Sequence, residues 1–470
     1  MAGIALKKKS NIDMTEGGIA GNLLKFAMPL LFGNLFQQLY NMVDTYVIGK
    51  TNNNDAYAAV GSVGPIINIL LGFFLGLSAG AGVVISQYYG AKNEIKVKKA
   101  THTAMAMTLI MSVLFTVLGV TLAPFLVSLM LRGETDSELF KLATQYLTIY
   151  FSGVTGLMIY NIGAGILRAI GDSKRPVYFL IFSAVTNTVL DVVFVFFFNM
   201  GVAGVAIATV IAQIGAAALV VITLSRSDTW VRLSIKELRL DKEILLKIVK
   251  IGIPAAIQMA LTAFSNIFVQ SYVSGANAPV GMSTTDAQSI YLSSWTTYSK
   301  VDGLLFLPLQ SLSVAATTFV GQNLGAGNIK RAKSGALICY GIASACTFVL
   351  MLPIIIFAPA IASVFNSDTA VVANSAMLLR NISPFYMLCC VNQILSGALR
   401  GAGKTTAPMV LMLTTFVGIR QIYLFLMSGY ISNEFFHIAL GYPLGWACCA
   451  IGTLVYFFKC DFSKCNITKK

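Results

Sequence analysis

Charged residues are scarce in this chain of 470 residues, where Asp, Glu, Lys and Arg together make up 11%. An average soluble domain contains about 25%. Several stretches carry no charge at all, among them 56–91, 104–131 and 334–367. A membrane-spanning helix needs about 20 apolar residues, and the alternating pattern of a membrane barrel is absent. The composition therefore excludes a soluble enzyme and predicts an all-α polytopic membrane protein.

Histidine is almost missing and cysteine is unevenly placed. The two His are His102 and His437, which leaves no histidine-rich metal site and no motif for Ser-His or Cys-His catalysis, so we expect no enzyme. All eight Cys lie beyond residue 338 without a CxxC pair, and we interpret them as packing residues. The segment "ALRGAGKT" (398–405) lacks the first Gly of a phosphate loop and follows an apolar helix, so we expect no ATP site.

The net charge of +14 is unevenly distributed along the chain. Lys and Arg gather in the segments 7–25, 92–99, 168–175, 226–250, 330–333, 400–404 and 459–470. This alternation follows the positive-inside rule and not the pattern of a nucleic-acid-binding surface. We therefore expect the plasma (inner) membrane, both termini in the cytoplasm, and contact with membrane lipid. Twelve spans are predicted, at 23–47, 57–86, 101–125, 142–167, 177–198, 202–225, 251–274, 288–316, 335–358, 374–398, 407–428 and 437–458.

The sequence repeats itself. Residues 23–49 resemble 248–275, "SQYYGAKNEIKVKKA" (86–100) resembles "GQNLGAGNIKRAKSG" (321–335), and "ILRAIGDSKRP" (166–176) resembles "ALRGAGKTTAP" (398–408). We predict a six-helix lobe over 15–225, a basic cytoplasmic linker over 226–249 and a second six-helix lobe over 250–460, related by a pseudo-two-fold axis along the membrane normal. Repeats of this kind are typical of transporters with a substrate site at their interface, and a monomer is sufficient.

Polar side chains recur on one face of the first and seventh spans. Their spacings of three and four residues define the sets Asn34, Gln37, Asn41 and Asp44, and Gln258, Thr262, Asn266 and Gln270. Such side chains either join neighbouring helices or line a wet cavity. Because the two stripes match between the repeats, we expect a shared substrate cavity.

Carboxylates inside the apolar spans are costly, at roughly 2.5–3.5 kcal/mol each. Asp44 and Asp191 have no acidic counterpart in the second repeat, and Asn187 lies four residues before Asp191 on the same helix face. We expect these groups to form a pocket in the first lobe that exchanges a proton or holds Na⁺. The alternative is that each Asp only bonds a neighbouring helix.

Two further charges lie in apolar spans. Asp302 is two residues from Lys300, which does not share its helix face, so Asp302 either faces the substrate cavity or bonds another span. Arg420 serves as a counter-ion or reaches the membrane surface.

Four segments in this order resemble the multidrug and toxic compound extrusion (MATE) family over about residues 20–458: "PLLFGNLFQQLYNMVDTYVIG", "GQNLGAGNIKRA", "LRAIGDSKRP" and "NTVLD". The resemblance, to prokaryotic members, implies an antiporter that exports cationic or amphipathic small molecules and other xenobiotics by alternating access. Its Na⁺ or H⁺ site corresponds to Asp44, Asn187, Asp191 and Thr209, with Asn161 nearby. No cofactor besides the coupling ion is implied.

Two features limit what the resemblance implies. Other branches of the family use an acid in span 7, where this chain has Gln258, Asn266 and Gln270. A lipid or lipid-linked oligosaccharide flippase of a related two-lobe fold is the alternative function. Its anionic headgroup would need several Arg in the cavity, and the intramembrane acids oppose it.

Overall fold

The computed structural model of the chain describes residues 11–49, 54–131, 135, 137–279 and 281–468, and the side chains of 39–46, 54 and 263 lie outside this description. All regular secondary structure in these ranges is helical. The first half contains α1 (Ile19–Gly49), α2 (Asn54–Gly90), α3 (Glu94–Met130), α4 (Glu138–Ser152), α5 (Val154–Ala169), α6 (Lys174–Val192), the π-helix η1 (Val193–Phe197) and α7 (Gly201–Ser225).

The second half follows the 3₁₀ turn η2 (Ile235–Glu237) and contains α8 (Lys242–Ser274), α9 (Thr284–Gly325), α10 (Ile329–Ile356), α11 (Ala358–Ser363), α12 (Thr369–Ile382), η3 (Ser383–Phe385), α13 (Tyr386–Gly401), α14 (Thr406–Met412), the π-helix η4 (Leu413–Ile419), α15 (Arg420–Leu426), the π-helix η5 (Met427–Ile431), α16 (Phe435–Ala439), α17 (Gly441–Lys459) and η6 (Phe462–Cys465).

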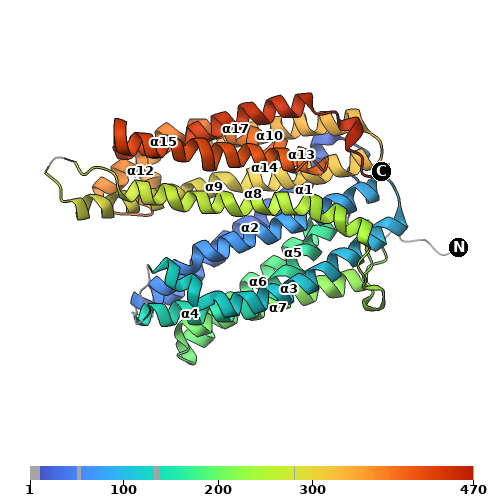
Figure 1. Ribbon diagram of the computed structural model, residues 1–470, viewed down its shortest axis with the longest axis horizontal. Helices are drawn as coiled ribbons and strands as arrows, with labels where there is room; N and C mark the ends of the chain where they lie inside the picture. Colours follow the sequence, from blue (N-terminus) through green and yellow to red (C-terminus); the bar gives the residue numbers. More distant parts are fainter. Residues whose placement is uncertain (1–10, 50–53, 132–134, 136, 280, 469–470) are drawn as a thin grey trace.

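The helices form two lobes that lie side by side (Figure 1). Helices α3–α7 make up most of one lobe and α9–α17 most of the other, while α2 and α8 run along the border and contact each other. Helix α1 contacts α6 on one side and α9 on the other. The predicted all-α, two-lobe membrane fold is confirmed.

The fourth predicted span differs from a single straight helix. Eleven helices within the described residues are long and apolar enough to cross a membrane, and a twelfth span results when α4 and α5 are counted together. The sequence predicts one span over 142–167, and the structure builds this segment from two helices that meet at an angle of 48°. They join at Gly153, where a Cβ atom would overlap the side chain of Val210 on α7. The glycine lets the bend lie directly against α7.

Small residues bring α2 and α8 into close contact. Glycines at 72, 76 and 80 recur every fourth residue of α2 and so share one face. A Cβ atom at Gly76 would overlap the backbone of Ala256, and one at Gly80 would lie 2.5 Å from the Cα of Gly252. Between helices in a membrane, association depends on this kind of close packing because lipid is as apolar as the side chains. The glycine face of α2 therefore joins the two lobes.

Helices α2 and α9 cross at their carboxyl ends. A Cβ atom at Gly90 would overlap the carbonyl of Gln322, and one at Gly325 would overlap the carbonyl of Gln87. The repeat similarity pairs these residues, Gly90 with Gly325 and Gln87 with Gln322. The crossing is thus nearly symmetric and brings the lobes together at one end of the molecule.

The two glutamines at this crossing exchange hydrogen bonds between the lobes. Gln87 Nε2 donates to the carbonyl of Gly401, the last residue of α13, at 3.0 Å. Gln322 Nε2 donates to the carbonyl of Ala169, the last residue of α5, at 2.8 Å. Each glutamine therefore satisfies a helix-terminal carbonyl of the opposite lobe, a group that has no partner within its own helix.

The side-chain oxygens of the same glutamines bind the two terminal segments of the described chain. The backbone N–H of Met14 donates to Gln322 Oε1 at 3.1 Å, and that of Ile467 donates to Gln87 Oε1 at 2.9 Å. Both side chains are fully buried. The end of the molecule that contains the crossing is therefore closed by hydrogen bonds from both lobes and both terminal segments.

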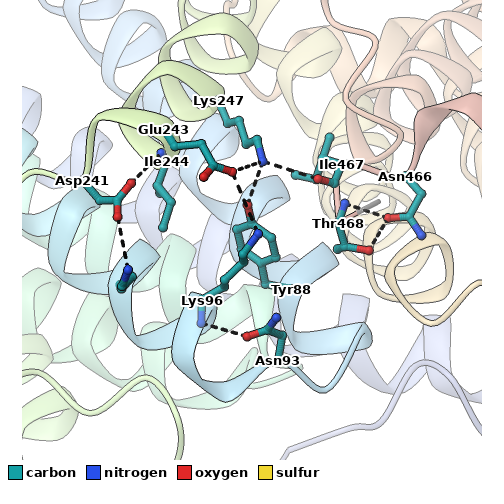
Figure 2. A network of polar contacts seen from close by, with 11 residues as sticks. Tyr88, Asn93, Lys96, Asp241, Glu243, Ile244, Lys247, Asn466, Ile467 and Thr468 are labelled. Carbon is teal, nitrogen blue, oxygen red and sulfur yellow. Dashed lines mark hydrogen bonds and ion pairs between the residues drawn. The ribbon is translucent and has the colours of Figure 1, made fainter. Parts of the chain in front are cut away.

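A surface network surrounds this closed end (Figure 2). Lys247 Nζ on α8 contacts Tyr88 Oη on α2 at 3.1 Å, Glu243 Oε1 at 2.7 Å and the carbonyl of Ile467 at 3.5 Å. Within the predicted linker, α8 already begins at Lys242, since the side chain of Asp241 caps it by accepting from the N–H of Ile244 at 3.2 Å. The linker is thus partly helical.

The basic segments found in the sequence meet at the same end. Lys98 forms an ion pair with Glu237 at 2.8 Å, and its hydrogen bond lowers the pKa of that carboxyl. Arg331 donates to the carbonyls of Glu16 and Gly17 at 2.9 and 2.8 Å. Exposed pairs of this kind contribute little to stability. The relevant feature of these residues is that their positive charges gather at the closed end.

We expect Gly76→Ala to destabilise the protein by about 1–3 kcal/mol, because the new methyl group overlaps α8 and forces the helices apart. Gly61→Ala and Gly64→Ala are matched controls on the same helix, where nothing lies within 4 Å of the added Cβ. Thermal unfolding of the purified variants in detergent measures the difference. Equal stability of Gly76→Ala and the controls would contradict the close packing of α2 on α8.

Candidate functional site

A buried polar cluster lies between α6 and α7 of the first lobe. Asn187 and Asp191 come from adjacent turns of α6, and Thr209 comes from α7. Asn187 Nδ2 lies 3.5 Å from Asp191 Oδ1 and 3.3 Å from Thr209 Oγ1. The exposed fractions of these side chains are 2%, 0% and 7% in the order Asn187, Asp191 and Thr209. The structure thus brings together three residues that the sequence places in one site.

The cluster offers oxygen atoms to a small cation. Asp191 supplies a carboxylate, Thr209 a hydroxyl, and Asn187 Oδ1 is buried without a hydrogen-bond partner in the described part of the chain. A buried polar atom of this kind costs about 1–3 kcal/mol unless a partner reaches it. Hard cations prefer carboxylate and neutral oxygen ligands, so the residues present fit either a Na⁺ ion or a proton on the carboxylate.

The helix carrying the acid changes geometry directly beyond it. Residues Val193–Phe197 form the π-helix η1 immediately after α6. Segments of π-helix inside longer helices are uncommon and occur frequently at functional sites. The wider turn begins two residues beyond Asp191, within the same continuous span.

The remaining residues predicted near this cluster have different positions. The side chains of Asn41 and Asp44 lie outside the described residues, although both belong to α1. Asn161 is buried on α5, but its side chain donates to Leu157 of its own helix at 2.9 Å. Ser78 of α2 donates to the Asn161 carbonyl at 2.6 Å. Asn161 therefore joins α2 to α5 and forms no hydrogen bond to the Asn187 cluster within the described residues.

A separate cavity of about 590 Å³ lies between the lobes. Its polar lining includes Gln38, Asn68, Thr262, Asn266, Gln270, Asp302 and Arg420, and its aromatic lining includes Trp295, Phe306, Phe416, Tyr442 and Trp446. On α8 the cavity touches the carboxyl-terminal half, and on α9 the amino-terminal two-thirds, as far as Gln310. The cavity therefore lies away from the closed end, where α8 begins and α9 ends.

The predicted cavity residues are only partly brought together. Asn266, Gln270 and Asp302 line the cavity. Gln258 is buried against Met412 Sδ at 2.7 Å, and Asn34 Nδ2 donates to Ser311 Oγ on α9 at 3.2 Å. Those two residues join helices and are not part of the lining, because their side chains are already used in packing contacts.

Gln37 is partly buried, and its neighbour Gln38 lines the cavity. Asp302 forms no ion pair with Lys300 in the described structure. Instead, Tyr298 Oη lies 3.4 Å from Asp302 Oδ1, while the exposed Lys300 lies over the Phe365 ring at 5.7 Å. The i,i+2 spacing indeed separates the two charges.

Arg420 also lines the cavity. The sequence left two roles open for it, a counter-ion or a side chain that reaches the membrane surface. Its exposed fraction is 1%. It donates to the Phe416 carbonyl at 3.1 Å, to Ser265 Oγ at 2.5 Å and to Asn266 Oδ1 at 3.2 Å. The guanidinium also lies over the Tyr442 ring at 4.7 Å. Arg420 thus faces the protein interior and does not reach the membrane surface.

The aromatic lining was also missed. Two of the three Trp in the chain, Trp295 and Trp446, line the cavity. A signal existed, because Trp295 and Asp302 are seven residues apart on α9 and so share one helix face. The partners from α17 lie far away in sequence and carry no such pattern.

The sequence profile of the MatE family matches residues 29–193 and 254–426, one copy in each lobe. The chain belongs to the MatE family. The resemblance inferred from the sequence motifs is thereby confirmed.

Relatives of this MatE chain cover almost its whole length. It is 28% identical over 459 residues to the probable multidrug resistance protein YoeA of Bacillus subtilis, covering 94% of each chain. It is 30% identical over 439 residues to the probable multidrug resistance protein YpnP of the same organism, covering 93% of this chain and 95% of the relative. A solved MOP superfamily transporter from Pyrococcus furiosus superimposes with a TM-score of 0.88 at 20% identity, covering 99% of this chain and 100% of that chain. That likeness shows the fold.

We expect Thr209→Val to weaken cation binding at the Asn187 cluster by about tenfold, because losing one oxygen that bonds a charged group costs about 1.5 kcal/mol. Ion binding to the folded protein raises its unfolding temperature, so the shift is titrated with Na⁺ at fixed pH and separately with pH. Thr121→Val is the matched control, since the exposed Thr121 of α3 makes the same bond to the carbonyl four residues earlier. An unchanged ion dependence in Thr209→Val would contradict the site.

Proposed function

We propose that this MatE-family protein is a multidrug exporter that exchanges cationic or amphipathic small molecules for Na⁺ or H⁺ across the plasma membrane. The relatives YoeA and YpnP are named probable multidrug resistance proteins, which supports the export of drugs. The observation that carries the coupling is the buried carboxylate of Asp191, grouped with Asn187 and Thr209 inside a membrane lobe. A charge in this place is costly, and reversible binding of a cation gives a reason for it.

The separation of two sites supports exchange between ion and drug. The Asn187 cluster lies between α6 and α7, whereas the cavity of about 590 Å³ lies between the lobes and is large enough for a drug-sized molecule. Binding of the ion changes the charge and hydrogen bonding of the first lobe. By linkage, an ion that weakens drug binding is itself released more easily when drug binds.

Alternating access requires that the space between the lobes is closed at one end of the molecule while a cavity lies toward the other end. The α2–α9 crossing and the glutamine bonds close the end where the basic segments meet. By the positive-inside rule this end is cytoplasmic, with both terminal segments. The cavity is then on the outward-facing side, ready to exchange drug for ion. Opening the cytoplasmic end requires both lobes to separate at the crossing.

The cavity lining argues against a flippase for a pyrophosphate-linked lipid. Among the described lining residues Arg420 is the sole cation, and Asp302 contributes a carboxylate to the same cavity. A headgroup with several negative charges would require several guanidinium or ammonium groups. The protein acts as a transporter, and the proposed cycle contains no catalytic step.

Ethidium transport into proteoliposomes tests the proposal, under an imposed Na⁺ gradient and separately under an imposed pH gradient. We expect one gradient to drive transport, and Asp191→Asn to reduce the rate to that of empty liposomes, because the amide carries no charge to bind the ion. Asp55→Asn is the control, since Asp55 is an exposed carboxylate at the start of α2.

Transport that continues at the wild-type rate in Asp191→Asn would remove the carboxylate from the coupling mechanism. Absence of transport under both gradients, in protein that is monodisperse and folded, would reject ion-coupled export itself.

A further inference from the structure

A buried guanidinium without a carboxylate partner is the feature that the proposed export of cations does not use. Arg420 is 1% exposed, and none of its contacts in the described structure is to an acidic side chain. A buried charge that lacks an opposite charge is strongly destabilising. An arginine in this position inside a membrane helix therefore indicates a function.

Neutral groups hold the guanidinium in place without neutralising it. A backbone carbonyl, a hydroxyl and an amide oxygen, from Phe416, Ser265 and Asn266, accept three of its five N–H donors. Tyr442 adds a ring 4.7 Å away, and its own Oη donates to Asn266 Oδ1 at 3.0 Å. These contacts fix the orientation of Arg420 while its positive charge remains available to a ligand in the cavity.

The helix is shaped locally to place this residue. The π-helix η4 (Leu413–Ile419) ends immediately before Arg420. In the aligned first repeat, Thr188 stands at the corresponding position, inside the regular α6. The repeat therefore does not require an arginine or a π-helix at this position. At this position only the second lobe has them, and π-helical turns are frequent at functional sites.

The opposite charge lies on another helix of the same cavity and is separated from Arg420 by aromatic rings. Asp302 contacts Tyr298, whose ring lies 5.3 Å from that of Trp295, and Trp295 lies 5.3 Å from Tyr442. Asp302 and Arg420 form no ion pair. Among the described lining residues, the cavity thus presents one carboxylate, one guanidinium and aromatic rings that connect them.

We propose that Arg420 is a specificity-determining residue that binds the acidic group of zwitterionic aromatic substrates. The carboxylate of the substrate pairs with Arg420, its cationic group with Asp302, and its ring system packs on Trp295 and Tyr442. Arginine suits this task because its planar guanidinium matches a carboxylate and keeps its charge. The proposal deepens the proposed export function by naming a substrate class for the same cavity.

Two fluorescent dyes that differ in one group provide the test. Rhodamine 110 has a free carboxylate, and rhodamine 123 is its methyl ester. Binding of each to the purified full-length protein is measured by fluorescence polarisation, with no ion gradient. We expect Arg420→Gln to weaken binding of rhodamine 110 by at least about tenfold and that of rhodamine 123 by less than about threefold, because the ester has no charge to lose.

Three further variants complete the design. Asp302→Asn is expected to weaken binding of both dyes alike, since both carry the same cationic xanthylium ring system. Arg420→Lys keeps the charge without the planar fork, so rhodamine 110 should bind with intermediate strength. Arg380→Gln is the control, because Arg380 is exposed and bonds the Ile355 carbonyl away from the cavity. Unfolding temperatures verify that each variant is folded.

Several results would overturn the proposal. One is an equal loss of affinity for both dyes in Arg420→Gln. The others are an unchanged affinity for rhodamine 110 in that variant, and a wild-type protein that binds rhodamine 123 but not rhodamine 110. If Arg420→Gln does not fold, the affinities of the two dyes for the wild-type protein and for Arg420→Lys decide the proposal. Dye binding is measured without an ion gradient. Failure of ethidium transport would therefore reject the proposed export function without deciding whether Arg420 binds the carboxylate.

Discussion

The close crossing of backbones that small residues permit is the constraint on which the rest of this structure depends. On α2, glycines face Gly252 and Ala256 of α8, and Gly90 meets the end of α9. These contacts bring the lobes together at one end, so that their helices diverge toward the other end and leave the cavity between them (Figure 1). A bulkier residue at the crossing would separate the lobes at the wrong end. Van der Waals packing, and not a hydrophobic driving force, holds such helices together in a membrane.

The two lobes share one repeat but hold different buried charges. The first lobe surrounds the carboxylate of Asp191 with the amide of Asn187 and the hydroxyl of Thr209. The second surrounds the guanidinium of Arg420 with the hydroxyl of Ser265 and amide and backbone oxygens. In both places neutral polar groups of the same lobe contact the charged side chain. The two lobes thus share a repeated scaffold and differ in the buried charge that each holds.

Much of the fold was predictable because hydrophobicity and charge act over whole segments. The spans, the two lobes and the grouping of Asn187 with Asp191 four residues later follow from such patterns. The bend at Gly153 did not, since an apolar run looks the same whether its helix is straight or broken. The sequence stripe also included Asn34 and Gln258, which instead bond Ser311 and contact Met412. Spacing identifies the face of a helix but not the neighbour that the face meets, and for the same reason the role of Arg420 stayed open between a counter-ion and a side chain that reaches the membrane surface.

The glutamine bonds at the closed end have a consequence for the length of the chain. Gln322 holds Met14, and Gln87 holds Ile467, so each terminal segment completes the bonding of a side chain that also spans the two lobes. Shortening either terminus past these residues would leave a buried amide oxygen without its donor. The segments around Met14 and Ile467 thus belong to the joint between the lobes, which has to open in the proposed transport cycle.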